Sequence, residues 1–130
     1  MSATLSSQEL QSRVQVWEAL ADFWLDTELV DYEFDHIARV IAESPYSVAE
    51  IRDIHDYEVA PAVSGNLASV TGEWAGFDSK WLAARCHAYA LRRHSPLFRL
   101  RIWLQRPLLR SYTERYWQQV MLRVRALRGE

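Results

Sequence analysis

The chain contains few residues that break helices or form tight turns, and this scarcity limits the folds it can adopt. Its 130 residues include only four glycines and four prolines. An all-β domain needs many short strands joined by turns, and those turns depend on glycine and proline. A few long helices need far fewer turns. The sequence therefore predicts an all-α fold, a compact bundle of about five to six helices that forms a single domain over residues 1–130.

Apolar residues recur at helical spacing in the N-terminal part of the chain. The pattern predicts one helix that begins after Ser6 or Ser7 and ends near 25–27, and a second that begins at Asp31 and ends before Pro45. The residues expected to face the core are Leu10, Val14, Trp17, Ala21 and Trp24 in the first helix, and Phe34, Ile37, Ala38 and Ile41 in the second.

Capping signals mark the next two helices. Ser47 and Glu50 have the spacing of a capping box, which predicts a third helix that runs to about Val59. Pro61 then either bends this helix or opens a short new one. Another helix is expected over 78–94, with an aspartate as its N-cap.

The C-terminal segment is ambiguous at its start. Ser95 and Pro96 indicate the beginning of a helix. Residues 98–102 alternate between apolar and charged, so 97–106 is either helix or strand, and helix is favoured because a single strand would have no partner. Pro107 is expected to end this element. A last helix should then bury Leu109, Tyr112, Tyr116, Val120, Val124 and Leu127.

Charge is divided unequally along the sequence. Residues 1–80 contain 15 of the 17 Asp and Glu residues but only four basic ones, whereas residues 81–130 contain 11 arginines and two glutamates. The formal total of −2 therefore conceals an acidic part and an Arg-rich part. Such asymmetry bears on partners and association more than on fold, and the two parts can also neutralise each other within one domain.

Several short motifs in the first two thirds of the chain suggest a relationship to known proteins. They are Val16–Leu20, Leu25–Glu28, Ile37–Val40, Ser44–Ser47, Tyr57–Pro61, Asn66–Leu67 and Trp74–Leu82. Together they resemble a family of small uncharacterised bacterial proteins, a domain of unknown function with a Trp-Ala-Gly-Phe-Asp motif. The resemblance covers about residues 13–90, stops short of the Arg-rich end from Arg92 onward, and brings no catalytic residues. It implies a compact, mostly helical bacterial protein, and such proteins are often immunity proteins encoded beside secreted toxins.

The densest acidic cluster is the first place to look for a site. It consists of Asp22, Asp26, Asp31, Glu33 and Asp35. Oxygen-rich clusters suit Mg²⁺ or Ca²⁺, but this spacing matches no known metal-binding loop, and acidic residues are common at helix starts. We therefore expect a solvated acidic face and no bound metal.

No pattern in the sequence indicates catalysis. Glu33 and His36 have the Glu-x-x-His spacing of di-metal bundles, but the second pair, His55 and Glu58, is in reversed order, which predicts structural or surface histidines. Cys86 lies in an apolar stretch and is expected to be a buried, inert thiol. With no nucleophile–base pair and no phosphate-binding glycine loop, we expect a protein that is not an enzyme and that holds no cofactor.

The leading functional hypothesis is a non-enzymatic protein-binding module, specifically a bacterial immunity protein that binds and neutralises a secreted toxin through the acidic cluster. A concentrated patch of one charge speeds association with a basic partner. The alternative is a protein that binds nucleic acid or a membrane surface through its Arg- and Trp-rich end, for which the candidate residues are Arg99, Arg101, Trp103, Arg106 and Trp117.

The N-terminal residues show neither the basic region nor the apolar region of a signal peptide. The longest apolar stretch, 97–109, is interrupted by arginines and is too short to span a bilayer. The sequence therefore predicts a cytoplasmic protein and leaves its oligomeric state open.

Overall fold

The computed structural model describes residues 6–24, 29–63 and 79–129, and these residues form helices without any strand. The α-helices are α1 (Ser7–Ala21), α2 (Asp31–Glu43), α3 (Val48–Ile54), α4 (Ala60–Val63), α5 (Ser79–Leu91) and α6 (Pro96–Leu127). Short 3-10 turns at Asp22–Trp24 and Arg92–His94 extend α1 and α5. The predicted all-α fold class is confirmed. The expectations for Asp26 and for the aspartate cap at 78 concern positions outside the described residues.

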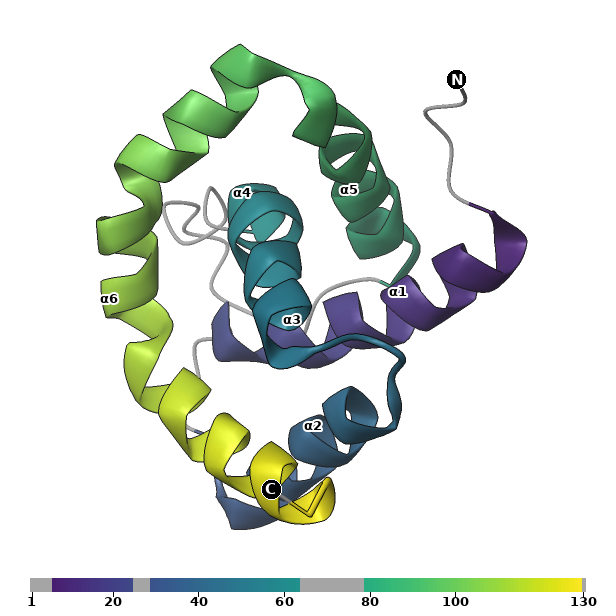
Figure 1. The fold of residues 1–130 in the computed structure, drawn as a ribbon, viewed down its shortest axis with the longest axis vertical. Coiled ribbons are helices and arrows are strands. Elements are labelled where there is room, and N and C mark those ends of the chain that lie inside the picture. Colours follow the sequence, from purple (N-terminus) through teal and green to yellow (C-terminus); the bar gives the residue numbers. More distant parts are fainter. Residues whose placement is uncertain (1–5, 25–28, 64–78, 130) are drawn as a thin grey trace.

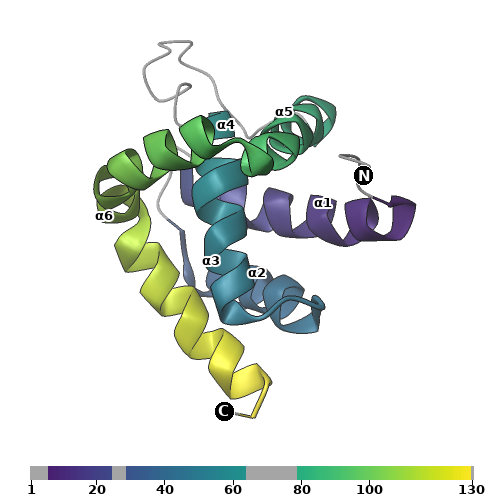
Figure 2. The ribbon, with the colours of Figure 1, turned by 45° about the horizontal axis from the view of Figure 1, so that its top comes forward.

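The helices are arranged around α3 and α4, which follow one another through the centre of the molecule (Figure 1). In the same view α6 curves around one side of this central element, from α5 at one end to α2 at the other. Figure 2 shows the same relation after a turn of 45°. Of the described elements, α2 and α6 share the most extensive contact. The acidic and Arg-rich parts of the sequence are therefore packed directly against each other.

Three of the predicted helix starts are capped by serine. The side-chain oxygens of Ser6, Ser47 and Ser95 each accept a hydrogen bond from the backbone N–H three residues later, over 3.1, 3.1 and 3.4 Å. Glu50 completes the capping box, because its Oε1 accepts the N–H of Ser47 over 2.9 Å. These bonds satisfy backbone donors that have no partner within the helix. Local sequence therefore determines where α1, α3 and α6 begin.

The predicted core faces of the first two helices are largely confirmed. In α2 all four predicted residues are buried. Trp17 in α1 and Trp24 in the 3-10 turn that follows are buried, while Leu10 and Val14 are only half-buried. Cys86 has no exposed surface, and burial raises the pKa of its thiol, which keeps it protonated and unreactive. One apolar cluster joins α1, α2, α3, α4, α5 and α6.

The prediction that Pro107 ends a helix is wrong. Residues 97–106 are helical and α6 continues through Pro107 to Leu127. Proline has no N–H to donate to the carbonyl of Trp103, four residues earlier, and this loss is tolerable because Pro107 is exposed and water can hydrate that carbonyl. Leu127, predicted to lie in the core, is also exposed. Burial of Ile102 and Val120 on the opposite side holds α6 together across the proline.

The end of α6 is anchored by one arginine. The guanidinium of Arg128 donates hydrogen bonds of 2.7 to 3.4 Å to the backbone carbonyls of Ile41, Ala42, Ser44 and Tyr46. Ile41 and Ala42 lie in the last turn of α2, where backbone acceptors lack partners within the helix, and Ser44 and Tyr46 follow it. Arg128 thus joins the end of α6 to the segment between α2 and α3.

The third predicted helix contains an irregularity that the sequence pattern does not reveal. Regular α3 ends at Ile54, and residues His55–Val59 form a π-helix, called here the π-turn, before α4 begins. The N–H of Ala60 bonds to the carbonyl of His55, five residues earlier. Pro61 follows at once, and its missing N–H and bulky ring disfavour a regular turn at this position. The wider turn brings five consecutive side chains into the interior.

Candidate functional site

The π-turn carries the most unusual cluster of polar side chains among the described residues. All five of its residues are buried, and His55, Asp56 and Glu58 have no exposed surface at all. Helices α1, α5 and α6 each contact this turn, so every side of it faces protein. Buried charges are costly unless they are paired and hydrogen-bonded. Irregular π-turns also occur often at functional sites, so the partners of these three residues decide what the cluster does.

Glu58 receives hydrogen bonds from three residues on two other segments of the chain. Its carboxylate accepts the indole N–H of Trp17 over 2.7 Å and two N–H groups of Arg13 over 3.2 and 3.3 Å. Arg93 adds a fourth bond of 2.9 Å from the end of α5. Although burial by itself lowers the pKa of Arg13, the bond and the charge of Glu58 outweigh it and raise that pKa. Both carboxylate oxygens are therefore fully occupied by donors within the protein.

Asp56 and His55 form a second buried group. Arg110 donates two hydrogen bonds to Oδ2 of Asp56, over 3.0 and 2.7 Å, and Nδ1 of His55 lies 3.1 Å from Oδ1. The other ring nitrogen of His55 accepts the indole N–H of Trp24 over 3.2 Å. Burial alone would raise the pKa of Asp56, but the bonds from His55 and Arg110 lower it. Burial lowers the pKa of His55, so its ring is neutral at pH 7.

An aspartate that orients a histidine is typical of a catalytic base, but the geometry here does not support that role. In such a base the free ring nitrogen faces the substrate. In this protein Nε2 of His55 is occupied by Trp24, and the ring is stacked on that indole with centroids 5.9 Å apart. The two buried groups are therefore structural. They join α1, α5 and α6 to the centre of the fold.

The acidic cluster predicted from the sequence is divided by the fold. The carboxylates of Asp31 and Asp35 lie 3.4 and 2.8 Å from the guanidinium of Arg123 on α6. Glu33 accepts the N–H of Val30 over 3.0 Å and so caps its own helix. Asp26 lies outside the described residues.

Asp22 has a different environment from the rest of the cluster. It is half-buried at the end of α1. Burial and, to a smaller extent, the nearby Glu33 carboxylate raise the pKa of Asp22 to about 6. Only part of the predicted acidic face is therefore free to meet a partner.

Ion pairs connect the acidic part of the sequence to the Arg-rich part. Arg93 and Arg110 reach the π-turn, Arg123 reaches the start of α2, and Arg52 donates a bond of 2.9 Å to Glu114. Part of the charge division seen in the sequence is thus neutralised by ion pairs within the molecule. Within the three described ranges, no three His, Cys, Asp or Glu side chains converge to form a metal-binding group.

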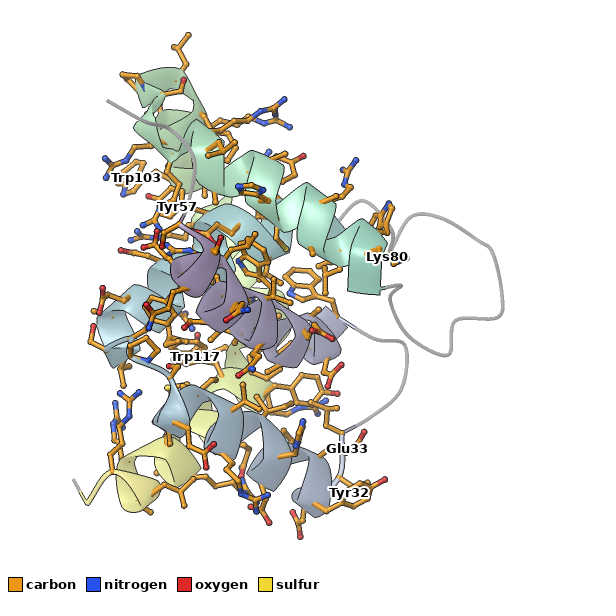
Figure 3. All side chains as sticks on the ribbon, turned by 90° about the vertical axis from the view of Figure 1, so that its right-hand side faces the viewer. Tyr32, Glu33, Tyr57, Lys80, Trp103 and Trp117 are labelled. Atoms are coloured by element: carbon orange, nitrogen blue, oxygen red, sulfur yellow. The ribbon has the colours of Figure 1, made fainter. Side chains whose placement is uncertain are left out.

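The alternative surface predicted on the Arg-rich end remains available. Arg99, Arg101 and Trp103 are exposed on α6, and Arg106 is half-buried. No ion pair joins these three arginines to a described residue. Trp117 is separate from them because it is buried beneath the guanidinium of Arg52, which lies 4.4 Å above its ring. Figure 3 shows Trp103 and the acidic start of α2, marked by Tyr32 and Glu33, at opposite ends of the molecule.

Four exposed leucines lie on the same part of α6 as these arginines. The sequence pattern did not single them out. Leu97, Leu100, Leu104 and Leu108 are 53% to 80% exposed, and their spacing of three, four and four residues places them along one side of α6. We call these four residues together with Trp103 the leucine face. The opposite side of the same turns is buried through Phe98 and Ile102. The N-terminal half of α6 is therefore apolar on two sides, one of which is open to solvent.

One family model matches a part of the sequence that includes both the acidic cluster and the leucine face. A family model described as a domain of unknown function, DUF7079, matches residues 11–123. The chain belongs to the DUF7079 family. The match extends past the 13–90 range expected from the motifs and takes in most of α6, including the leucine face. No curated protein and no solved structure matches this DUF7079 member. In the part of the chain that the structure describes, none of its helices is both long and apolar enough to cross a bilayer.

Proposed function

We propose that this DUF7079 protein is a non-enzymatic protein-binding module and that the leucine face is its contact surface. The observation that carries the proposal is the continuous exposure of four leucines and Trp103 along about three turns of one helix. Scattered exposed apolar residues are ordinary, but a contiguous patch with polar neighbours marks an interaction site. Tryptophan and arginine are also enriched among the residues that contribute most to binding.

The buried groups around the π-turn support a binding role rather than catalysis. His55 and Glu58 have all their polar atoms engaged by other parts of the protein. The nucleic-acid alternative cannot use Arg93, Arg110 and Arg123, because these arginines are already paired with carboxylates, and it rests on Arg99, Arg101 and Arg106.

The narrower form of the proposal concerns the partner. It states that the protein is a cytoplasmic immunity protein of bacterial origin and that the partner is a secreted toxin that it neutralises. Its support is that small solitary bacterial proteins of this kind are often immunity proteins, together with the uneven charge of the chain, which favours rapid association. Expression of the neighbouring gene tests this form. Growth arrest that is relieved by co-expression of this protein supports the toxin hypothesis. If expression of the neighbouring gene is harmless, the toxin hypothesis is rejected and the general protein-binding proposal is unaffected.

Site-specific photocrosslinking in the source cells tests the contact surface. Benzoylphenylalanine at Leu104 should crosslink to a defined protein, which mass spectrometry identifies. The same group at Leu122, an exposed leucine further along α6, is the matched control and should give no such product. A third position, Tyr32, reports on the acidic end of α2. Crosslinking from Tyr32 but not from Leu104 would transfer the function to the acidic cluster and overturn our assignment.

A further inference from the structure

The leucine face has the geometry of one half of a helix–helix seam. Along an α-helix, positions separated by three and four residues line one side, and such a row packs against a similar row on a second helix. Leu97, Leu100 and Leu104 follow this spacing, and Leu108 continues it one turn later. Arg101 and Trp103 lie on either side of the row. A helix is therefore the element that best matches the length and shape of this surface.

The charge around the seam defines the chemistry of that helix. From Pro96 to Thr113, α6 contains four arginines and no acidic residue. Arg99 and Arg101 are exposed and have no ion pair with any described residue. Residues beside a helix seam usually pair with the opposite charge on the neighbouring helix. A neighbour with glutamates or aspartates beside its own apolar row would satisfy these arginines.

The same charges disfavour a second copy of α6 as the neighbour. Two such helices would bring Arg101 and Arg99 of one copy close to the arginines of the other, and like charges across an interface are repulsive. We propose, building on the function above, that the leucine face binds an acidic amphipathic helix of a partner protein. Leucines of the partner would fill the seam, and its carboxylates would meet Arg101 beside the leucine row and Arg99 one turn before Trp103.

A pair of synthetic peptides tests this proposal with the full-length protein. The probe is a helical peptide of about three heptads with leucine at the a and d positions and glutamate at e and g. The matched control has lysine at e and g. Because like charges keep each peptide monomeric, titration calorimetry reports binding to the protein alone. The glutamate peptide should bind at least ten-fold more tightly than the lysine peptide, and this preference should shrink as salt increases.

Variants of the protein locate the contact. The double variant L100S/L104S should weaken binding of the glutamate peptide at least ten-fold, and L122S on the same helix should leave it unchanged. R101E should reduce the preference for glutamate over lysine. All four positions are exposed, so the variants should fold, and circular dichroism checks that they do. Equal binding of the two peptides, or equal loss in L100S/L104S and L122S, would overturn the proposal.

Two other outcomes identify a different occupant. Uptake of the protein by vesicles of phosphatidylglycerol and phosphatidylcholine, without binding of the glutamate peptide, would assign the leucine face to an anionic membrane. A dimer in light scattering that L100S/L104S abolishes would assign it to a second copy. If Leu104 crosslinks to a protein but the glutamate peptide does not bind, the binding function stands and only the acidic-helix chemistry fails.

Discussion

The indole N–H of Trp24 donates to Nε2 of His55 over 3.2 Å, and this bond determines the protonation of the imidazole. Because Nε2 accepts a hydrogen bond, the ring proton resides on Nδ1, where it is donated to Asp56 over 3.1 Å. A second proton would have to displace Trp24 within a site that has no exposed surface. The arrangement therefore links the pH of the solution to the stability of the core.

Acidification should destabilise the protein through His55. Burial lowers the pKa of His55 in the folded state below its usual 6.5, so the unfolded chain binds more protons below that pH. In an Asp22→Asn background, which removes the opposite contribution of Asp22, the free energy of unfolding should fall as the pH decreases from 7.5 through 6.5 to 5.5. Urea titration at each pH measures it. His55→Gln should flatten this dependence, and His36→Gln at an exposed position should not. An unchanged slope in His55→Gln would show that another group is responsible.

Replacement of Asp22 should act in the opposite direction. Its pKa is raised from 3.8 to about 6 in the folded state, so its contribution is most favourable below pH 3.8 and is lost as the pH rises through 6. Asp22→Asn should therefore stabilise the protein at pH 7 and have little effect near pH 4. Thermal unfolding at the two pH values measures the difference. Glu43→Gln, at an exposed site, should shift stability by less than about 0.5 kcal/mol at either pH, and equal gains at both pH values for Asp22→Asn would contradict the explanation.

Removal of the negative charge of Glu58 should be severely destabilising. Glu58→Gln removes the buried counter-ion of Arg13 and leaves it only the exposed Glu9, 3.5 Å away. Breaking a buried ion pair in this way costs about 3–5 kcal/mol. Asp53 is the matched control. Its carboxylate lies 3.9 Å from Arg93, which also binds Glu58, but the side chain of Asp53 is half-exposed. Asp53→Asn should cost less than about 1 kcal/mol. Urea-induced unfolding of the two variants compares these losses, and similar values for both would argue against a structural role of the buried cluster.

Replacement of Pro107 should stabilise the protein. Pro107→Ala restores a backbone N–H that can reach the carbonyl of Trp103, and proline within a helix costs roughly 3 kcal/mol in the absence of compensation. Part of this amount should be recovered as a higher melting temperature. Pro96 is the control, because the first turn of a helix accommodates proline and Pro96→Ala should give no gain. A loss of stability in Pro107→Ala would mean that packing of α6 requires the proline.

Much of the fold could be predicted because it depends on local signals. Ser6, Ser47 and Ser95 mark helix starts through bonds to residues only three positions away. The core face of α2 follows directly from its helical spacing. In contrast, the burial of Glu58 depends on Arg13 and Arg93, which are 45 and 35 residues away in sequence. No local pattern reports such partners.

The leucine face was difficult to predict for a different reason. The N-terminal half of α6 is apolar on its buried side and also on its exposed side, so its sequence shows no single hydrophobic stripe. The alternation of Phe98, Leu100 and Ile102 with arginines instead resembles a strand. Only the structure reveals that Phe98 and Ile102 are buried while Leu100 faces solvent. The continuation of α6 through Pro107 was hidden likewise, because tertiary packing outweighs the local preference of proline.

The pairing of the acidic part with the Arg-rich part has a consequence for the chain before it folds. Arg110 meets Asp56 and Arg123 meets Asp35 across 54 and 88 residues of sequence. The polypeptide thus resembles a polyanion tethered to a polycation, and such segments attract each other even without fixed structure. The denatured ensemble should accordingly be contracted at low ionic strength and should expand as added salt screens the two segments. Part of the electrostatic attraction seen in the native fold is then already present in the denatured state, and it guides distant segments toward each other from the first stages of folding.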